Sequence, residues 1–122
     1  MSKRYEEKVV SYVERFQTAV LSDGFEGFFH DDAGDHAQAT LNALLIVGAV
    51  EAAALLRRAM WLFDGAAPPP QRAVRREELS RVGEAGRSLL RQLDESFRRA
   101  NDELTRLLTE YSQATAELCA VT

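Results

Sequence analysis

Hydrophobic side chains recur at the spacing of an α-helix along almost the whole chain. Near the N-terminus the steps are three and four positions, which places the side chains on one helical face: Tyr5, Val9, Val13, Phe16 and Val20. Turn residues interrupt this pattern at positions 22–24. The pattern predicts a first helix up to about residue 21.

The glycine-bracketed segment 24–29 contains three phenylalanines. It is too short for a full helix and too rich in glycine for a strand. We predict a turn or short helix here, with Phe25, Phe28 and Phe29 in the core.

Two short helices are predicted next. The first should begin near Asp32 or Asp35, which suit a helix N-terminus, and end at Gly48. The second should run antiparallel to it, up to Asp64 and Gly65. The expected inward positions are Ala37, Leu41, Leu44 and Leu45, then Val50, Ala53, Leu56, Met60 and Phe63, with the second face widened by Ala54, Leu55, Ala59 and Trp61.

The last third of the chain holds the most regular pattern. After a proline-rich connector at 66–70 and a shorter helix at 72–82, hydrophobic positions alternate in steps of three and four. They are Leu90, Leu93, Phe97, Ala100, Leu104, Leu107, Tyr111, Ala114 and Leu118. This pattern predicts one long helix from about 87 to 120, at about 1.5 Å per residue.

These elements predict an all-α fold, a compact bundle of about five helices ending in one long C-terminal helix. Residues 1–122 are expected to form a single domain. Two interpretations of the long helix remain. It packs entirely into the core, or its exposed part pairs with a second copy in a homodimer.

Composition narrows the class of protein. The chain has 122 residues, 46% hydrophobic and 28% charged, which is typical of a soluble globular protein and not of a disordered one. No apolar run approaches the ~20 residues that span a membrane. The single cysteine, Cys119, allows no internal disulfide and is expected to be structural. We therefore expect a cytoplasmic protein.

Three residues form a candidate metal site. His30, Asp32 and His36 lie close in sequence, and Asp32 and His36 are one helical turn apart. The spacing matches no known zinc motif, and helix capping is the alternative interpretation. Motifs for nucleotide binding or a serine nucleophile are absent from the sequence. We expect no enzyme activity, no cofactor and no metal, with a metal-dependent enzyme as the alternative.

Arginines dominate the middle of the chain. Ten of them lie between Arg57 and Arg99, which raises direct nucleic-acid binding as another alternative. Acids at helical spacing are expected to pair with several arginines: Glu77 with Arg81, Glu95 with Arg99, and Asp102 with Arg106. The net charge is -4, so we expect no direct contact with nucleic acid.

Acidic residues form the candidate binding site. Five of them lie between positions 23 and 36, with no lysine or arginine among them: Asp23, Glu26, Asp31, Asp32 and Asp35. Because the phenylalanines between them should turn inward, the acids should turn outward. They form either a patch that binds a basic protein surface, or a soluble rim with a helix cap.

Several segments resemble the DNA mimic protein 19 family. The matching motifs are Asp23-Gly24-Phe25-Glu26-Gly27-Phe28-Phe29, Gly34-Asp35, a helix ending in Leu44-x-x-Val47-Gly48-Ala49, Ala54-Leu55-Leu56-Arg57-Arg58-Ala59, Phe63 before a glycine and prolines, and Leu93-Asp94-Glu95-x-Phe97. The resemblance runs from about residue 22 to 111. It departs from the family at two places. Asp23-Gly24-Phe25 and then Gly27 stand where the family tends to have Asn-Gly-Gly-Phe followed by glutamine, and His30-Asp31 stands where it tends to have asparagine after the aromatic pair.

The resemblance implies an all-helical protein. The named member of that family is a dimer whose acidic surface imitates DNA and binds a transcription factor. By this resemblance the chain is expected to be a non-enzymatic interaction module, a DNA-mimic-like regulator of a DNA-binding protein. Its mixed charge, 15 basic and 19 acidic residues, is less acidic than a dense phosphate mimic requires.

Overall fold

The computed structural model describes the backbone of residues 2–121 and the side chains of residues 5–117. Five α-helices and two short 3-10 helices make up the described chain, and that part contains no strand. In chain order they are α1 (Ser2–His30), η1 (Asp32–His36), α2 (Ala37–Ile46), α3 (Val50–Met60), η2 (Asp64–Ala66), α4 (Arg72–Ser80) and α5 (Gly83–Val121). The all-α prediction with a long last helix is confirmed.

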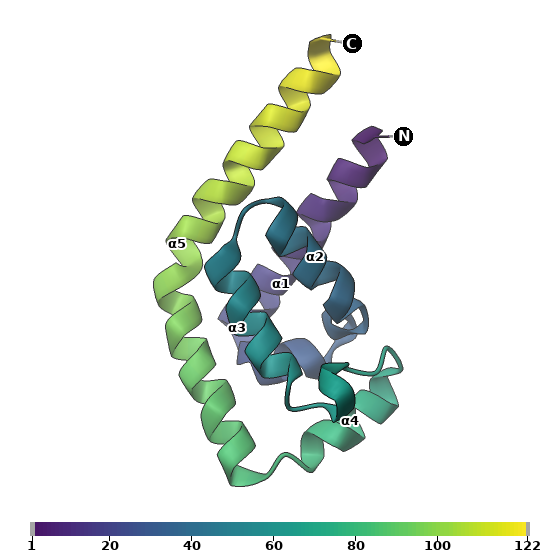
Figure 1. Ribbon diagram of the computed structural model, residues 1–122, viewed down its shortest axis with the longest axis vertical. Coiled ribbons are helices and arrows are strands. Elements are labelled where there is room, and N and C mark those ends of the chain that lie inside the picture. Colours follow the sequence, from purple (N-terminus) through teal and green to yellow (C-terminus); the bar gives the residue numbers. More distant parts are fainter. Residues whose placement is uncertain (1, 122) are drawn as a thin grey trace.

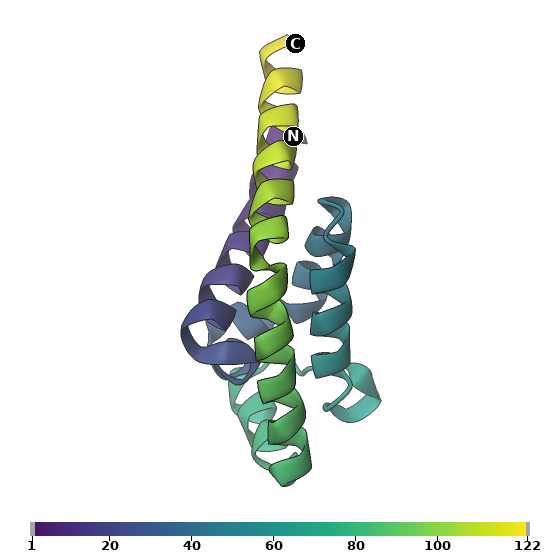
Figure 2. The same cartoon turned by 90° about the vertical axis from the view of Figure 1, so that its left-hand side faces the viewer.

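Helices α1 and α5 lie side by side and run in opposite directions (Figures 1 and 2). The hairpin formed by α2 and α3 packs against this pair, and α4 lies near the kinked end of α1. At the opposite end of the molecule, α1 and α5 project beyond the corner between α2 and α3. The hairpin therefore covers only part of the long helix.

An aromatic cluster forms the centre of the core. Phe16 contacts Phe28 and Phe97 edge to face, with ring centroids 5.3 Å apart in both pairs. Phe25 joins them, and Phe29 packs on Phe63 at 4.9 Å. Edge-to-face pairs add stabilisation beyond the burial of area. The prediction that the three phenylalanines of segment 24–29 enter the core is confirmed, because all three are fully buried.

Helix α5 packs into the core along only part of its hydrophobic seam. The seam is buried from Leu90 to Leu104, partly exposed at Leu107 and Tyr111, and exposed at Ala114. The side chains of Leu118 and Cys119 lie outside the described residues. Within residues 2–121, no helix combines the length and apolar character needed to cross a membrane.

Four side chains expected on the inward faces are exposed instead. Leu45, Val50, Ala54 and Trp61 all reach solvent, and Trp61 and Val50 are 71% and 69% exposed. The reason is that α2 and α3 are apolar over much of their circumference, while each is covered on one side only. Helical periodicity alone does not show which apolar side a neighbour covers.

The prediction that Asp32 or Asp35 caps the start of the second helix is also wrong. No side chain caps the start of η1 or α2, and a 3-10 turn precedes α2. Asp35 is held instead by arginines of α4.

Candidate protein-binding surface

The acidic segment is built on a kink in α1. Gly24 has φ 73° and ψ -178°, so the helix stops there and restarts at once, at Phe25. This region of backbone space is essentially restricted to glycine. A Cβ at Gly24 would also lie 2.5 Å from Oδ2 of Asp94. The kink turns residues 25–30 so that their phenylalanines enter the core and Glu26 stays outside.

Asp94 of α5 caps the restarted helix from across the fold. The backbone N–H of Phe25 donates to Oδ1 of Asp94 at 2.8 Å. Partial burial raises the pKa of Asp94 above its ordinary value, although the bond from Phe25 opposes this shift. The cap fixes where the restarted helix begins, and so fixes the position of Glu26 one residue later.

Arg75 of α4 fastens the other end of the acidic segment. Its side chain is fully buried. The guanidinium donates to the carbonyls of Phe29 at 2.6 Å and Asp31 at 2.8 Å, and to those of Pro69 and Pro70. These bonds tie the end of α1 to the proline-rich connector.

Gly34 makes room for this arginine. A Cβ at Gly34 would lie 2.6 Å from the carbonyl oxygen of Phe28 and 3.0 Å from Nε of Arg75. The glycine in the Gly34-Asp35 motif is therefore required by close packing.

Asp35 is paired with two arginines. Its carboxylate accepts from Arg75 at 2.7 Å and from Arg72 at 2.8 Å. These bonds hold the pKa of Asp35 far below its ordinary value, because both arginines favour the charged form. Asp35 is also only partly exposed. Its charge is satisfied inside the fold, which sets it apart from the other four acids.

The other four acids of the segment are exposed. They are Asp23, Glu26, Asp31 and Asp32, and we call them the acidic surface. None of them forms an ion pair with any side chain described between residues 5 and 117.

Two shallow hollows join the acidic surface into one region. Asp23, Asp31 and Asp32 border a hollow of about 450 Å³ together with Arg15, and Asp23, Glu26 and Asp31 border one of about 320 Å³. Because Asp23 and Asp31 border both, the hollows are neighbours. The structure thus brings four of the five predicted acids together.

The histidines of the candidate metal site lie in different surroundings. His30 is exposed beside the acidic surface, whereas the ring of His36 lies 5.6 Å from that of Tyr12. Among the described side chains, no three His, Cys, Asp or Glu residues come close enough to hold a metal ion.

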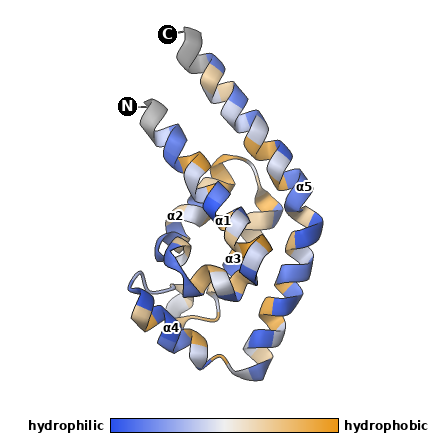
Figure 3. Ribbon diagram, turned by 180° about the vertical axis from the view of Figure 1, so that it is seen from behind, coloured by the Kyte–Doolittle hydropathy of each residue, from blue (hydrophilic) through white to orange (hydrophobic). Residues whose placement is uncertain are grey.

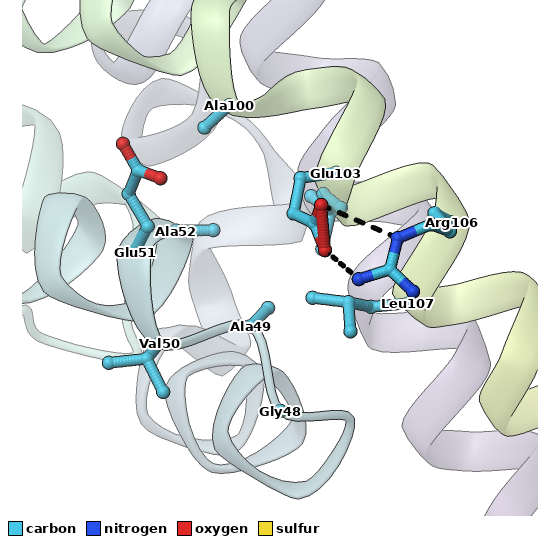
Figure 4. A pocket seen from close by; sticks show the side chains of 10 residues that line it. Gly48, Ala49, Val50, Glu51, Ala52, Ala100, Glu103, Arg106 and Leu107 are labelled. Atoms are coloured by element: carbon cyan, nitrogen blue, oxygen red, sulfur yellow. Dashed lines mark hydrogen bonds and ion pairs between the residues drawn. The ribbon is translucent and has the colours of Figure 1, made fainter.

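A separate hollow of about 340 Å³ lies between the start of α3 and α5 (Figure 4). Three alanines and two leucines supply half of its lining residues. Glu103 on its rim is held by Arg106, which also binds Glu110. The arginine on this rim is therefore already paired within α5.

Several arginines in the middle of the chain form ion pairs with acidic residues. The expected pair of Glu77 and Arg81 is present. Glu95 binds Arg98 rather than Arg99, and Arg106 binds Glu103 and Glu110 rather than Asp102. The expected registers were wrong by one turn or less, because i,i+3 and i,i+4 partners are both within reach on a helix.

Comparison with known proteins gives one family. The family model for DMP19-like proteins matches residues 4–115, nearly the whole chain. The chain belongs to the DMP19-like protein family. Comparisons with curated proteins and with solved structures gave no match.

Several of the motifs on which the sequence resemblance rests have structural roles in this DMP19-like chain. The Gly24-Phe25 and Asp94 motifs meet at the kink of α1, where Asp94 accepts the N–H of Phe25. The Gly34-Asp35 motif receives Arg75. These motifs therefore fix the shape of the acidic segment, while the acidic surface itself supplies the charge.

Sequence reasoning missed Arg75 and Asp94. Asp94 lies between Leu93 and Phe97 of the seam, so its position at the edge of a buried face was a usable signal. Arg75 had no such signal, because its partners at Phe29, Asp31 and Asp35 are 40 or more residues away.

Proposed function

We propose that this DMP19-like protein acts by binding another protein, and not by catalysis, through its acidic surface. One observation supports the proposal most. Asp23, Glu26, Asp31 and Asp32 are exposed around two neighbouring hollows, and none forms an ion pair with a described side chain, whereas Asp35 pairs with both Arg72 and Arg75.

The proposed mechanism is electrostatic. Unpaired carboxylates on one region attract a basic surface and raise the rate of association. The partner's lysines and arginines then replace water around Asp23 and Asp31, which border both hollows. Because exposed charges are screened beyond about 8 Å at 0.15 M salt, the binding should weaken as salt rises.

The proposed partner is a DNA-binding protein, such as a transcription factor. Its DNA-contacting face is basic, as the acidic surface requires. The family to which the chain belongs supports this choice, because its model takes its name from a DNA mimic. With one cysteine and no possible internal disulfide, we place the protein in the cytoplasm.

The test uses a variant that neutralises only the acidic surface: Asp23→Asn, Glu26→Gln, Asp31→Asn and Asp32→Asn. Asp35 is left unchanged because it stabilises the fold through Arg72 and Arg75. A matched control removes the same charge from four exposed acids elsewhere: Glu7→Gln, Asp64→Asn, Asp102→Asn and Glu117→Gln. Each protein is immobilised and exposed to host lysate, and duplex DNA is then added at constant ionic strength.

We expect the wild type and the control to retain DNA-binding proteins that the added DNA releases, and the acidic-surface variant to lose them. Retention of the same proteins by all three would refute the proposal. So would retained proteins that DNA does not displace. Binding of duplex DNA by the chain itself would favour the arginine-based alternative, and a thermal shift with zinc would favour the metal alternative.

A further inference from the structure

The outer face of α3 carries exposed side chains at helical spacing. They are Val50, Glu51, Ala54, Arg57, Arg58 and Trp61, and we call them the α3 stripe. They recur in steps of three and four along the helix, so they share one face. All six are exposed, and Val50 and Glu51 also border the hollow between α3 and α5.

The apolar ends of the α3 stripe are the unusual part. Trp61 and Val50 are the two most exposed large hydrophobic side chains of the described chain. Figure 4 shows Val50 pointing away from α5, and Figure 3 shows a hydrophobic connection between α2 and α3 beside it. Tryptophan is enriched among the residues that dominate protein interfaces. A surface of this kind favours burial against a partner.

We propose that the α3 stripe is the interface between two copies of this chain, related by a two-fold axis. An isologous interface must be complementary to itself. If two α3 helices cross in antiparallel fashion at the middle of the stripe, Val50 lies level with the partner's Trp61. Ala54 is near the centre, where a small side chain allows the two helices to approach closely.

Charge selects this antiparallel arrangement. Glu51 is at the N-terminal end of the stripe, and Arg57 and Arg58 are at the C-terminal end. In the antiparallel pair, Glu51 lies about two residues, or ~3 Å along the axis, from the level of the partner's Arg58. No described side chain forms an ion pair with any of these three residues. A parallel pair would instead bring like charges together.

This interface differs from the one that the long helix suggested. It uses α3 rather than the projecting part of α5, and it shares no residue with the acidic surface. The experiment can therefore fail without affecting the proposed function.

The first measurement is the mass of the full chain by sedimentation equilibrium over a wide range of concentration. We expect a dimer whose dissociation constant rises roughly thirtyfold or more with Trp61→Lys. Val74→Lys is the matched control, because Val74 is a half-exposed hydrophobic residue of α4 outside the stripe. It should leave the dimer unchanged. Circular dichroism verifies that each variant keeps its helices.

Charge reversal gives the sharper test. One variant, Glu51→Arg, has a positive stripe, and another, Arg57→Glu with Arg58→Glu, has a negative stripe. Neither should pair with itself, but a mixture of the two should form a heterodimer, because each copy then meets opposite charges. A wild type that stays monomeric would overturn the proposal. A dimer unaffected by Trp61→Lys, or one lost instead with Ala114→Glu on α5, would also overturn it.

Discussion

Replacing Arg75 by methionine should destabilise the whole fold, although Arg75 lies on a helix of only nine residues. Methionine keeps the apolar length of the side chain but donates no hydrogen bond. The carbonyl of Phe29 then loses its donor in a buried position. The carbonyls of Pro69 and Pro70 lose theirs in partly buried positions. The carbonyl of Asp31 keeps only the N–H of Gly34, and the carboxylate of Asp35 keeps only Arg72.

The magnitude follows from these contacts. An unsatisfied buried acceptor costs about 1–3 kcal/mol, and each partly buried bond contributes roughly 0.5–1.5 kcal/mol. Burial of the methionine offsets part of the loss, since it is worth about 1.5–3 kcal/mol. We expect a net loss of about 2–5 kcal/mol in the free energy of unfolding, because several hydrogen bonds are lost while the carboxylate of Asp35 keeps Arg72. The melting temperature should fall by about 10–20 °C.

Urea unfolding followed by circular dichroism measures this loss. Arg76→Met is the matched control, because Arg76 is the next residue, is exposed, and donates one bond to the carbonyl of His30 at 2.7 Å. It should cost no more than about 1.5 kcal/mol. Arg75→Lys should fall between the two, since an ammonium lacks the planar fork that reaches several carbonyls. Equal losses for Arg75→Met and Arg76→Met would refute the reasoning.

Three further predictions concern the same region. Gly24→Ala should lower the free energy of unfolding by about 1–3 kcal/mol through backbone strain alone, and by more because the new Cβ would contact Asp94. Gly65→Ala is the control, because Gly65 also has positive φ but lies in open space, and urea unfolding should show a smaller loss for it. The pKa of Asp35 in the folded state is below its ordinary 3.8, so the stabilisation from its ionised form is present above about pH 4 and is lost as the pH falls further. Asp35→Asn should therefore lower the free energy of unfolding at pH 7 and make it less dependent on pH below 4. An unchanged dependence on pH would contradict this prediction. The pKa of Asp94 in the folded state is above 3.8, so the free energy of unfolding should fall as the pH rises from about 4 through that raised pKa. Asp94→Asn keeps an acceptor for the N–H of Phe25 and should abolish this dependence on pH. Urea unfolding curves measured from pH 4 upward would test it.

The sequence predicted the helices well because their hydrophobic side chains recur regularly at helical spacing. The seam from Leu90 to Leu104 and the phenylalanines of segment 24–29 are buried as expected. Both predictions rest on local patterns, in which spacing or glycine brackets fix the face that turns inward.

The errors came from contacts between distant segments. Asp35 was expected to cap a helix, a local role for an acid before a helix, but Arg72 and Arg75 hold it from 37 and 40 residues away. Val50 and Trp61 were expected inside because α3 is apolar over a wide arc. Only the arrangement of α2, α3 and α5 decides which part of that arc is covered.

The same distinction decides how the acidic segment should be tested. By sequence, five carboxylates form one class, but the structure divides them into four that face solvent and one that belongs to the fold. A variant that neutralises all five would lose binding whether the acids contact a partner or the segment merely unfolds. Leaving Asp35 intact separates these causes, because Arg75 then still fixes the carbonyls of Phe29 and Asp31. Loss of binding by such a variant can be attributed to the four exposed charges themselves.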